Sequence, residues 1–312
     1  METTHKIAGW KKKTLVDELL HFQEVASLIL PRRHCFPRLP SIDYFATITP
    51  HKGCVGGDHM IILNFDEYHI KERALAAQEA GNMTLAAALA KNFDRFGILI
   101  ADAAGHRVTD NVTVNYLHAA FKVGVAYELK QHGEVTAGLF ELLNMNFYNR
   151  MTPEYMHSKP FVTLIYGEVL DNGAFRYLSA GHPAPIVFSV EHDMIERLGR
   201  ECTRNTTPLG VLPSEYNIDT ESFEPSTAIK AKYPVNEITL LGKGDVLLLY
   251  TDGLMEVDCP DGSGQDFCDT RLEQVLRKKK TGTAKDIHNA IMEERAAFPI
   301  EDDITLAVIK KR

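Results

Sequence analysis

The sequence predicts an α+β fold in which antiparallel sheets carry pairs of helices on their faces. Short runs rich in β-branched and aromatic residues indicate strands, and these runs are clustered instead of alternating one by one with helices. Two long helical patterns, at about 109–130 and 135–150, lie between the third and fourth of these runs, and another pair occupies about 269–297. This clustering favours α+β over a doubly wound parallel sheet.

The composition is that of an ordinary globular protein. Of the 312 residues, 45% are hydrophobic and 24% are charged, and the net charge of −8 argues against a nucleic-acid partner, because phosphate binding needs a basic excess. The five cysteines form no C-x-x-C pair, so neither a disulfide framework nor a zinc knuckle is indicated. No run reaches the roughly 18 apolar residues that a membrane span needs. We therefore expect a cytoplasmic protein with no membrane partner.

A helix is predicted at residues 14–30, and Pro31 ends it. Its apolar side chains are spaced 4, 3, 4 and 3 residues apart: Leu15, Leu19, Phe22, Ala26 and Ile29. This spacing suits the seam of a short coiled coil and equally an amphipathic helix docked on its own domain. The proline-rich stretch "PRRHCFPRLP" that follows is a rigid connector. We therefore divide the chain into residues 1–30, a candidate dimerisation or regulatory segment, and residues 31–312, the main domain.

Eight runs predict the strands of the main domain, and most of them are short. In chain order they are "IDYFATIT", "MIILNF", "FGILIA", "FVTLIYGEVL", "FRYLSA", "APIVFSV", "DVLLLY" and "ITLAVI". The alanine-rich stretch "ALAAQEAGNMTLAAALA", between the second and third runs, has a helical pattern. It belongs to a predicted helical insertion at about 67–94.

Aspartates stand at the ends of four predicted strands. Each lies next to an apolar run or within two residues of one: Asp58, Asp102, Asp252, and the pair Asp302 and Asp303. A single aspartate in such a place is usually a helix cap or a turn residue. If the strand ends converge, the carboxylates crowd together, and they cannot all stay ionised without a cation. Oxygen ligands of this kind select Mg²⁺ or Mn²⁺ over zinc.

A set of motifs runs through the chain over about residues 28–309. In order these are "LILP", "VGGD", "ADAAGH", "FVTLIYGEVLDNGAFRYLSAGHPAPIVF", "TPLGVLP", "GDVLLLYTDGLMEV" and "EDDITLAVI". The combination of "YLSAGHPAP" with "LLLYTDGLMEV" is highly specific, whereas "VGGD" or "DDIT" alone is a weak signal. With these motifs the chain resembles the metal-dependent protein phosphatases of the PPM class (PP2C-like), in the bacterial SpoIIE/RsbU branch.

The resemblance implies an αββα four-layer sandwich, in which a central antiparallel β-sandwich is flanked by helix pairs. It also implies a centre of two Mn²⁺ or Mg²⁺ ions at one end of the sheets. The activity implied is removal of phosphate from serine or threonine by water that the two ions activate. The expected substrate is a phosphorylated regulatory protein of the anti-sigma-factor antagonist type.

The site residues of the family carry over to positions that match its motifs. Asp102 would bridge the two ions. Asp58 and the backbone carbonyl of Ala103 would complete the site of one ion. Asp252 and Asp302 would hold the other ion. Gly57 and Asp303 would support these ligands from behind and orient them.

Three further residues in these motifs have two interpretations each. His106 and His182 are candidates for the general acid that protonates the leaving oxygen, or else hydrogen-bonded structural residues of a turn. Arg107 stands where the family has glycine, so it is a candidate clamp for the substrate phosphate. The alternative is an arginine on the surface that pairs with Asp110.

The chain departs from the family pattern in two other places. "VGGDHMI" lacks the second aspartate that relatives have after this motif, and Asp58 and Asp102 lie 44 residues apart because of the helical insertion. The insertion is a candidate lid, docking element or dimer contact. Two other function classes stay open: a catalytically weak binding module, which would be expected to lose metal carboxylates, and a hydrolase of small phosphoesters, which would usually show a glycine-rich phosphate loop.

Overall fold

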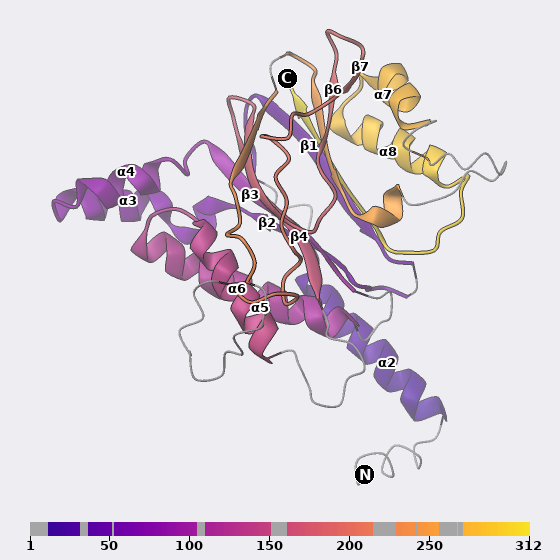
Figure 1. Ribbon diagram of the computed structural model, residues 1–312, viewed down its shortest axis with the longest axis horizontal. Helices are drawn as coiled ribbons and strands as arrows, with labels where there is room; N and C mark the ends of the chain where they lie inside the picture. Colours follow the sequence, from indigo (N-terminus) through magenta and orange to yellow (C-terminus); the bar gives the residue numbers. More distant parts are fainter. Residues whose placement is uncertain are drawn as a thin grey trace.

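Two five-stranded antiparallel sheets form the centre of the protein, and helices cover their outer faces (Figure 1). The computed structural model describes residues 12–31, 37–51, 53–104, 110–150, 161–214, 229–240, 242–255, 267 and 271–312. Every pairing between neighbouring strands in the two sheets is antiparallel. The predicted α+β class with antiparallel sheets is therefore confirmed.

The C-terminal strand is an inner strand of the first sheet. Its strands, in spatial order, are β1 (Ile42–Thr49), β10 (Ile304–Lys311), β9 (Val246–Tyr250), β6 (Ile186–Ser189) and β7 (Met194–Glu196). The second sheet is formed by β2 (Asp58–Leu63), β3 (Arg95–Ala103), β4 (Val162–Leu170), β5 (Ala174–Ala180) and β8 (Asn236–Thr239). All eight predicted runs overlap strands, and the two edge strands β7 and β8 were not predicted.

Helix pairs lie on both sheets, as the clustering predicts. The second sheet is covered by α5 (Asn111–Gln131) and α6 (Ala137–Arg150), and the first by α7 (Glu273–Lys279) and α8 (Ala284–Arg295) (Figure 1). A further hairpin of α3 (Ile70–Glu79) and α4 (Met83–Ala90) follows the short helix η3 (Phe65–Tyr68) and corresponds to the predicted insertion. None of the described helices is long and apolar enough to cross a membrane.

Three apolar layers hold these elements together. Because side chains alternate along a strand, neighbouring residues of one strand enter different layers. Ile100 and Leu249 lie between the two sheets, whereas Leu99 packs toward the helices on the second sheet and Leu248 toward α7 and α8. All four side chains are buried. Both faces of the central strands are therefore buried, which explains why these strands are apolar along their whole length.

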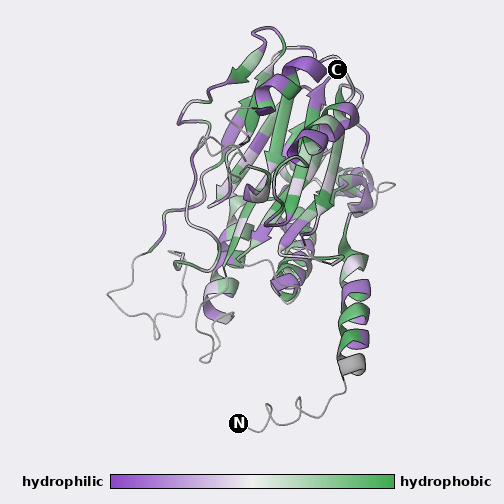
Figure 2. Ribbon diagram, turned by 90° about the vertical axis from the view of Figure 1, so that its right-hand side faces the viewer, coloured by the Kyte–Doolittle hydropathy of each residue, from purple (hydrophilic) through white to green (hydrophobic). Residues whose placement is uncertain are grey.

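Among the described residues, the N-terminal helix α2 (Lys12–Ala26) contacts the domain near its C-terminal end. Gln23 and Ala26 are buried, and Gln23 Oε1 accepts a hydrogen bond from the backbone N–H of Cys54 at 3.3 Å. Toward its start the helix stands away from the domain, and its ribbon contains both hydrophobic and hydrophilic residues (Figure 2). Leu19, in the predicted seam, is 45% exposed, and Leu20 is also exposed. The predicted seam is therefore docked at one end and open to solvent at the other.

A buried ion pair fixes two loops on α6. The Glu141 carboxylate lies 2.7 Å from Lys230 Nζ, and both side chains are almost fully buried. Glu141 also accepts hydrogen bonds from the Ser214 hydroxyl at 2.5 Å and the Tyr233 backbone N–H at 2.9 Å. Buried charges are tolerated only when they are paired and hydrogen-bonded in this way. The network holds the chain on both sides of residues 215–228 to a single helix.

We expect Glu141→Ala to lower the free energy of unfolding by about 3–5 kcal/mol, because the change leaves the Lys230 charge buried without its partner. Urea denaturation followed by circular dichroism measures the loss. Glu134→Ala is the matched control, since Glu134 pairs with Lys91 on the surface at 3.4 Å, and an exposed pair contributes at most about 1 kcal/mol. Equal stability losses in the two variants would contradict the role assigned to the network.

Candidate functional site

The structure brings the five predicted aspartates to one end of the sandwich. Asp58 and Asp102 lie directly opposite each other in the β2–β3 register. Asp252 begins the short helix η6 (Asp252–Leu254), just after β9, and Asp302 and Asp303 immediately precede β10. Because β9 and β10 are neighbours in the first sheet and β2 and β3 in the second, both sheets contribute carboxylates to this end.

Asp58 connects the two sheets directly. Its side chain is buried, and its Oδ2 atom accepts hydrogen bonds from the hydroxyls of Thr251 and Thr305, both at 2.7 Å. The two threonines are themselves joined, because the Thr305 backbone N–H donates to Thr251 Oγ1 at 2.8 Å. Sequence analysis did not identify these threonines, although each lies one to three residues from a predicted site aspartate in "YTDG" and "EDDIT".

Burial and mutual repulsion shift the titration of the central pair. Burial, the largest cause, raises the pKa of Asp58 to about 8, although the hydrogen bonds from Thr305 and Thr251 favour the ionised form. Burial also raises the pKa of Asp102 to about 9, with further repulsion from Asp58, Asp252 and other carboxylates of the cluster. At neutral pH, therefore, full ionisation of this cluster requires a compensating cation.

Asp303 binds the backbone of the loop that precedes β2. Its carboxylate accepts hydrogen bonds from the N–H groups of His51 at 2.6 Å and Gly57 at 2.7 Å. A Cβ on Gly56 would lie 1.9 Å from Asp303 Oδ2, so a side chain cannot be accommodated there. The Gly57 carbonyl in turn accepts a hydrogen bond from the backbone N–H of Ala103 at 3.1 Å. The predicted supports Gly57 and Asp303 thus connect the start of β2 with the end of β3 and the start of β10.

Two other residues hold the same loops from outside the cluster. Asn111, buried at the start of α5, donates a hydrogen bond from Nδ2 to the Gly56 carbonyl at 3.1 Å. Gly253 packs directly on the backbone of Asp303, and a Cβ at this glycine would lie 2.1 Å from the Asp303 carbonyl oxygen. Close backbone approach, and not conformational freedom, is the reason for glycine at this position.

The donor chemistry of the cluster fits hard divalent cations. The four predicted side-chain ligands, Asp58, Asp102, Asp252 and Asp302, are all carboxylates, which suit Mg²⁺ or Mn²⁺. Their oxygens do not converge on one point: within the described part of the chain, no three Asp, Glu, His or Cys side chains stand in metal-ligand positions. Two of these oxygens bind groups of the chain instead: Asp58 Oδ2 accepts hydrogen bonds from two hydroxyls, and Asp302 Oδ1 accepts one from the Asp303 backbone N–H at 2.8 Å.

His182 is a buried residue next to the strand pair that carries Asp102. Its Nδ1 atom lies 3.1 Å from the hydroxyl of Thr163, which is the β4 partner of Asp102. Burial lowers the pKa of His182 to about 3, so the ring is neutral near pH 7. This environment favours the structural interpretation of His182 over a general acid. His106 and Arg107, the other two candidates, lie outside the described residues.

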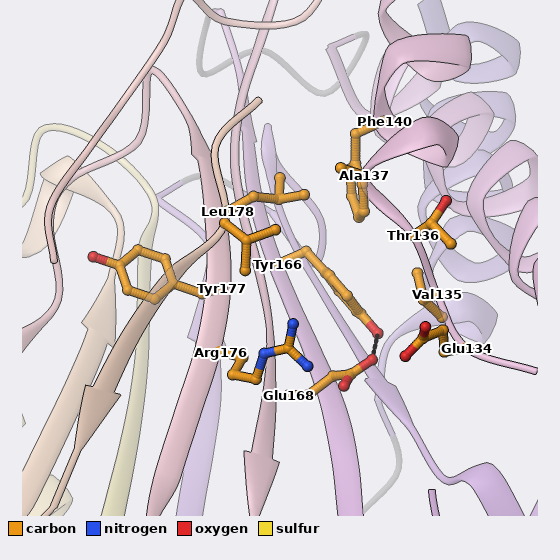
Figure 3. A pocket seen from close by; sticks show the side chains of 11 residues that line it. Glu134, Val135, Thr136, Ala137, Phe140, Tyr166, Glu168, Arg176, Tyr177 and Leu178 are labelled. Carbon is orange, nitrogen blue, oxygen red and sulfur yellow. Dashed lines mark hydrogen bonds between the residues drawn. The ribbon is translucent and has the colours of Figure 1, made fainter. Parts of the chain in front are cut away.

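A separate pocket of about 210 Å³ opens between α6 and the outer face of the second sheet. Figure 3 shows Tyr166 and Glu168 of β4 on one side and Val135, Thr136 and Phe140 on the other. Glu168 lies 2.5 Å from Arg95 at the start of β3, and β3 carries Asp102 near its other end. None of the five aspartates lines this pocket, so it is distinct from the carboxylate cluster.

Comparison with known proteins places this architecture in a family. Residues 93–312 match the family model described as stage II sporulation protein E (SpoIIE). The SiaA-PP2C domain of Pseudomonas aeruginosa aligns with a TM-score of 0.63 and 16% identity over 96% of this chain and 98% of that one. The RsbU and RsbW domains of a Mycobacterium tuberculosis protein align with a TM-score of 0.58 and 19% identity over 91% of this chain and 64% of that one. RsbX in complex with magnesium aligns with a TM-score of 0.52 and 14% identity over 88% of this chain and 98% of that one.

This chain therefore spans less than two thirds of the Mycobacterium tuberculosis structure and nearly all of the other two. At these identities the structural likeness establishes the fold, and the family model, which matches well over half of the chain, establishes the family. The chain belongs to the SpoIIE family, and its two sheets with flanking helices have the fold of the PP2C domain to which it aligns.

Proposed function

We propose that the protein is a metal-dependent serine/threonine protein phosphatase. The observation that carries this proposal is the gathering of carboxylates from both sheets at one end of the sandwich, with the pKa values of Asp58 and Asp102 raised by burial and repulsion. Such a cluster is stabilised by divalent cations, which suits metal-assisted hydrolysis of a phosphoester. Membership of the SpoIIE family supports the same activity.

We further propose two Mn²⁺ or Mg²⁺ ions as cofactors, in line with the magnesium in the RsbX structure. The residues that would hold them are Asp58, Asp102, the Ala103 carbonyl, Asp252 and Asp302. When bound, the ions supply acidification of water and neutralisation of charge on the phosphoryl oxygens. The chain itself keeps Asp58 in place through Thr251 and Thr305, and keeps the loop before β2 in place through Asp303.

The proposed substrate is a phosphorylated regulatory protein of the anti-sigma-factor antagonist type, in the cytoplasm. The family match and the RsbU neighbour support this substrate class. Two alternative functions, a binding module and a small-phosphoester hydrolase, predict other sequence features than those of this chain. A binding module without activity would not need all four ligand aspartates, which this chain retains, and a small-phosphoester hydrolase would usually carry a glycine-rich phosphate loop.

A homodimer through α2 is part of the proposal. The helix presents exposed apolar side chains at Val16, Leu19 and Leu20, and it touches the domain through Gln23. Gln23 accepts a hydrogen bond from the Cys54 N–H, and Cys54 lies between His51 and Gly57, two of the residues whose N–H groups donate to Asp303. Association of the helix can therefore affect the loop that leads to Asp58 through direct contacts.

The activity is tested by hydrolysis of p-nitrophenyl phosphate and of a phosphoserine peptide with Mn²⁺, with Mg²⁺ and with EDTA. We expect turnover with either metal, none with EDTA, and a loss of at least about 100-fold in Asp102→Asn, as for removal of other charge-stabilising groups from active sites. Asp94→Asn is the matched control, because Asp94 is exposed and lies just before the other end of β3. Full activity of folded Asp102→Asn at saturating Mn²⁺ would exclude the proposed metal site, and turnover of the small ester alone would favour the small-phosphoester alternative.

In EDTA, we expect the free energy of unfolding to fall as the pH rises. The pKa values of Asp58 and Asp102 are raised to about 8 and about 9 in the folded protein, whereas an unfolded aspartate titrates near about 3.9. Between these values the folded state binds more protons than the unfolded chain, so deprotonation destabilises it. Chemical denaturation from pH 5 to pH 9 measures this slope. Asp102→Asn should flatten it and Asp94→Asn should not, and identical slopes in all three proteins would contradict the assigned coupling.

Light scattering on the full chain tests the dimer. At concentrations on the order of tens of micromolar, where weak coiled coils still associate, we expect a dimer that Leu19→Glu converts to a monomer. Glu18→Gln is the control on the same helix, since Glu18 is also exposed. A monomeric wild-type chain would show that the start of α2 has no partner copy in solution.

A further inference from the structure

A buried arginine lies at the C-terminal end of α8, close to the carboxylate cluster but not part of it. Arg295 is only 1% exposed. Its guanidinium donates to four backbone carbonyls: Gly253 at 2.9 Å, Leu254 at 3.0 Å, Phe298 at 3.3 Å and Pro299 at 2.9 Å. These bonds use nearly all of the donors that a guanidinium has.

The four carbonyls belong to two different loops. Gly253 and Leu254 are in η6, which begins with Asp252, and Phe298 and Pro299 are in the segment that leads to Asp302 and Asp303. One side chain therefore binds the loop that leaves β9 and the loop that enters β10. In addition to sharing the guanidinium, the two loops contact each other directly, because Gly253 packs against the backbone of Asp303.

The partners of Arg295 differ from those of the other buried cations. Arg95 and Lys230 each pair with a carboxylate, Glu168 and Glu141 respectively. In the part of the chain that the structure describes, the guanidinium of Arg295 forms no such ion pair. The charge of Glu301 attracts it without forming a hydrogen bond, and its hydrogen bonds go to backbone carbonyls. Removing a charge from water costs free energy. A buried arginine whose hydrogen bonds go to backbone carbonyls therefore indicates that the positions of those carbonyls are important.

We infer that Arg295 is a positioning residue that fixes the loops of Asp252 and Asp302 relative to each other, and so sets the metal affinity of the site. The inference rests on the proposed function for its metal-dependent part. The planar fork of the guanidinium reaches carbonyls of both loops at once, which the point charge of a lysine cannot do. Arg295 is not one of the proposed metal ligands, and it acts through the backbone that carries them.

The test compares Arg295→Met and Arg295→Lys with two controls. Arg271→Ala breaks an exposed ion pair of 3.0 Å with Glu294, the residue before Arg295, and leaves the loops untouched. Ile291→Ala removes a buried side chain one turn earlier on α8 and serves as a destabilised control that keeps the Arg295 hydrogen bonds to both loops. Thermal unfolding ranks the four variants by stability, and Mn²⁺ binding is followed by the electron paramagnetic resonance signal of the free ion.

We expect Arg295→Met to bind Mn²⁺ about 10- to 100-fold more weakly than the wild type, the range found when supports behind metal ligands are removed. Arg295→Lys should recover only part of this loss, and both controls should bind Mn²⁺ normally. Hydrogen–deuterium exchange, measured in EDTA, should speed up in peptides covering 251–255 and 298–303 in Arg295→Met and stay unchanged there in Arg271→Ala. Ile291→Ala separates this effect from general loss of stability.

The outcomes distinguish the inference from the proposed function. Wild-type Mn²⁺ affinity and unchanged exchange in both loops of the Arg295 variants would overturn the positioning role, whatever the activity. A wild-type chain that binds Mn²⁺ but hydrolyses no phosphoester would overturn the proposed phosphatase activity and leave the positioning role standing. If Arg295→Met does not fold, Arg295→Lys decides by the same two measurements, because it keeps the buried charge and loses the planar fork.

Discussion

The carboxylate of Asp58 is the contact on which the arrangement at this end of the sandwich depends. It lies in the second sheet and accepts hydrogen bonds from the hydroxyls of Thr251 and Thr305, at the ends of strands β9 and β10 of the first sheet. These bonds hold a buried acid directly beside Asp102, in a register that brings two like charges together. Packing between the sheets supplies the free energy that keeps the pair in place. The raised pKa values are the consequence of this enforced proximity.

Close backbone approach is the second constraint, and it centres on Asp303. Its side chain binds the loop before β2, and its carbonyl oxygen lies against η6. Both contacts leave no room for a Cβ, at Gly56 on one side and at Gly253 on the other. The glycines of "VGGD" and "TDG" are therefore required by a residue that lies about 50 to 250 positions further along the chain. Motif and partner form one unit in space, although they are far apart in sequence.

The same separation decides what the sequence could predict. The strand-end positions of the aspartates and the helix pairs follow from local patterns, and they were predicted from them. The edge strands β7 and β8 were not predicted, because they have three and four residues and are partly exposed. The hydroxyl partners of Asp58 depend on how two sheets are stacked, which periodicity along one strand does not encode. The resemblance to a family supplied the ligand set, but not the contacts that hold the ligands.

Arg295 shows where a sequence signal existed and was not used. It continues the buried stripe of α8 formed by Ile287 and Ile291, at the same four-residue spacing, so helical periodicity places a charged side chain in the core. A buried cation this close to a carboxylate cluster can either form an ion pair with a carboxylate or donate hydrogen bonds to neutral carbonyls. An ion pair with a ligand carboxylate would lower the pKa of that group and compete with a metal for it. By binding carbonyls of the two loops, the guanidinium stabilises the backbone that carries the ligands without forming such a pair among the described residues. Its charge is therefore used to order the loops, and the negative charge of the cluster is retained for a cation from solution.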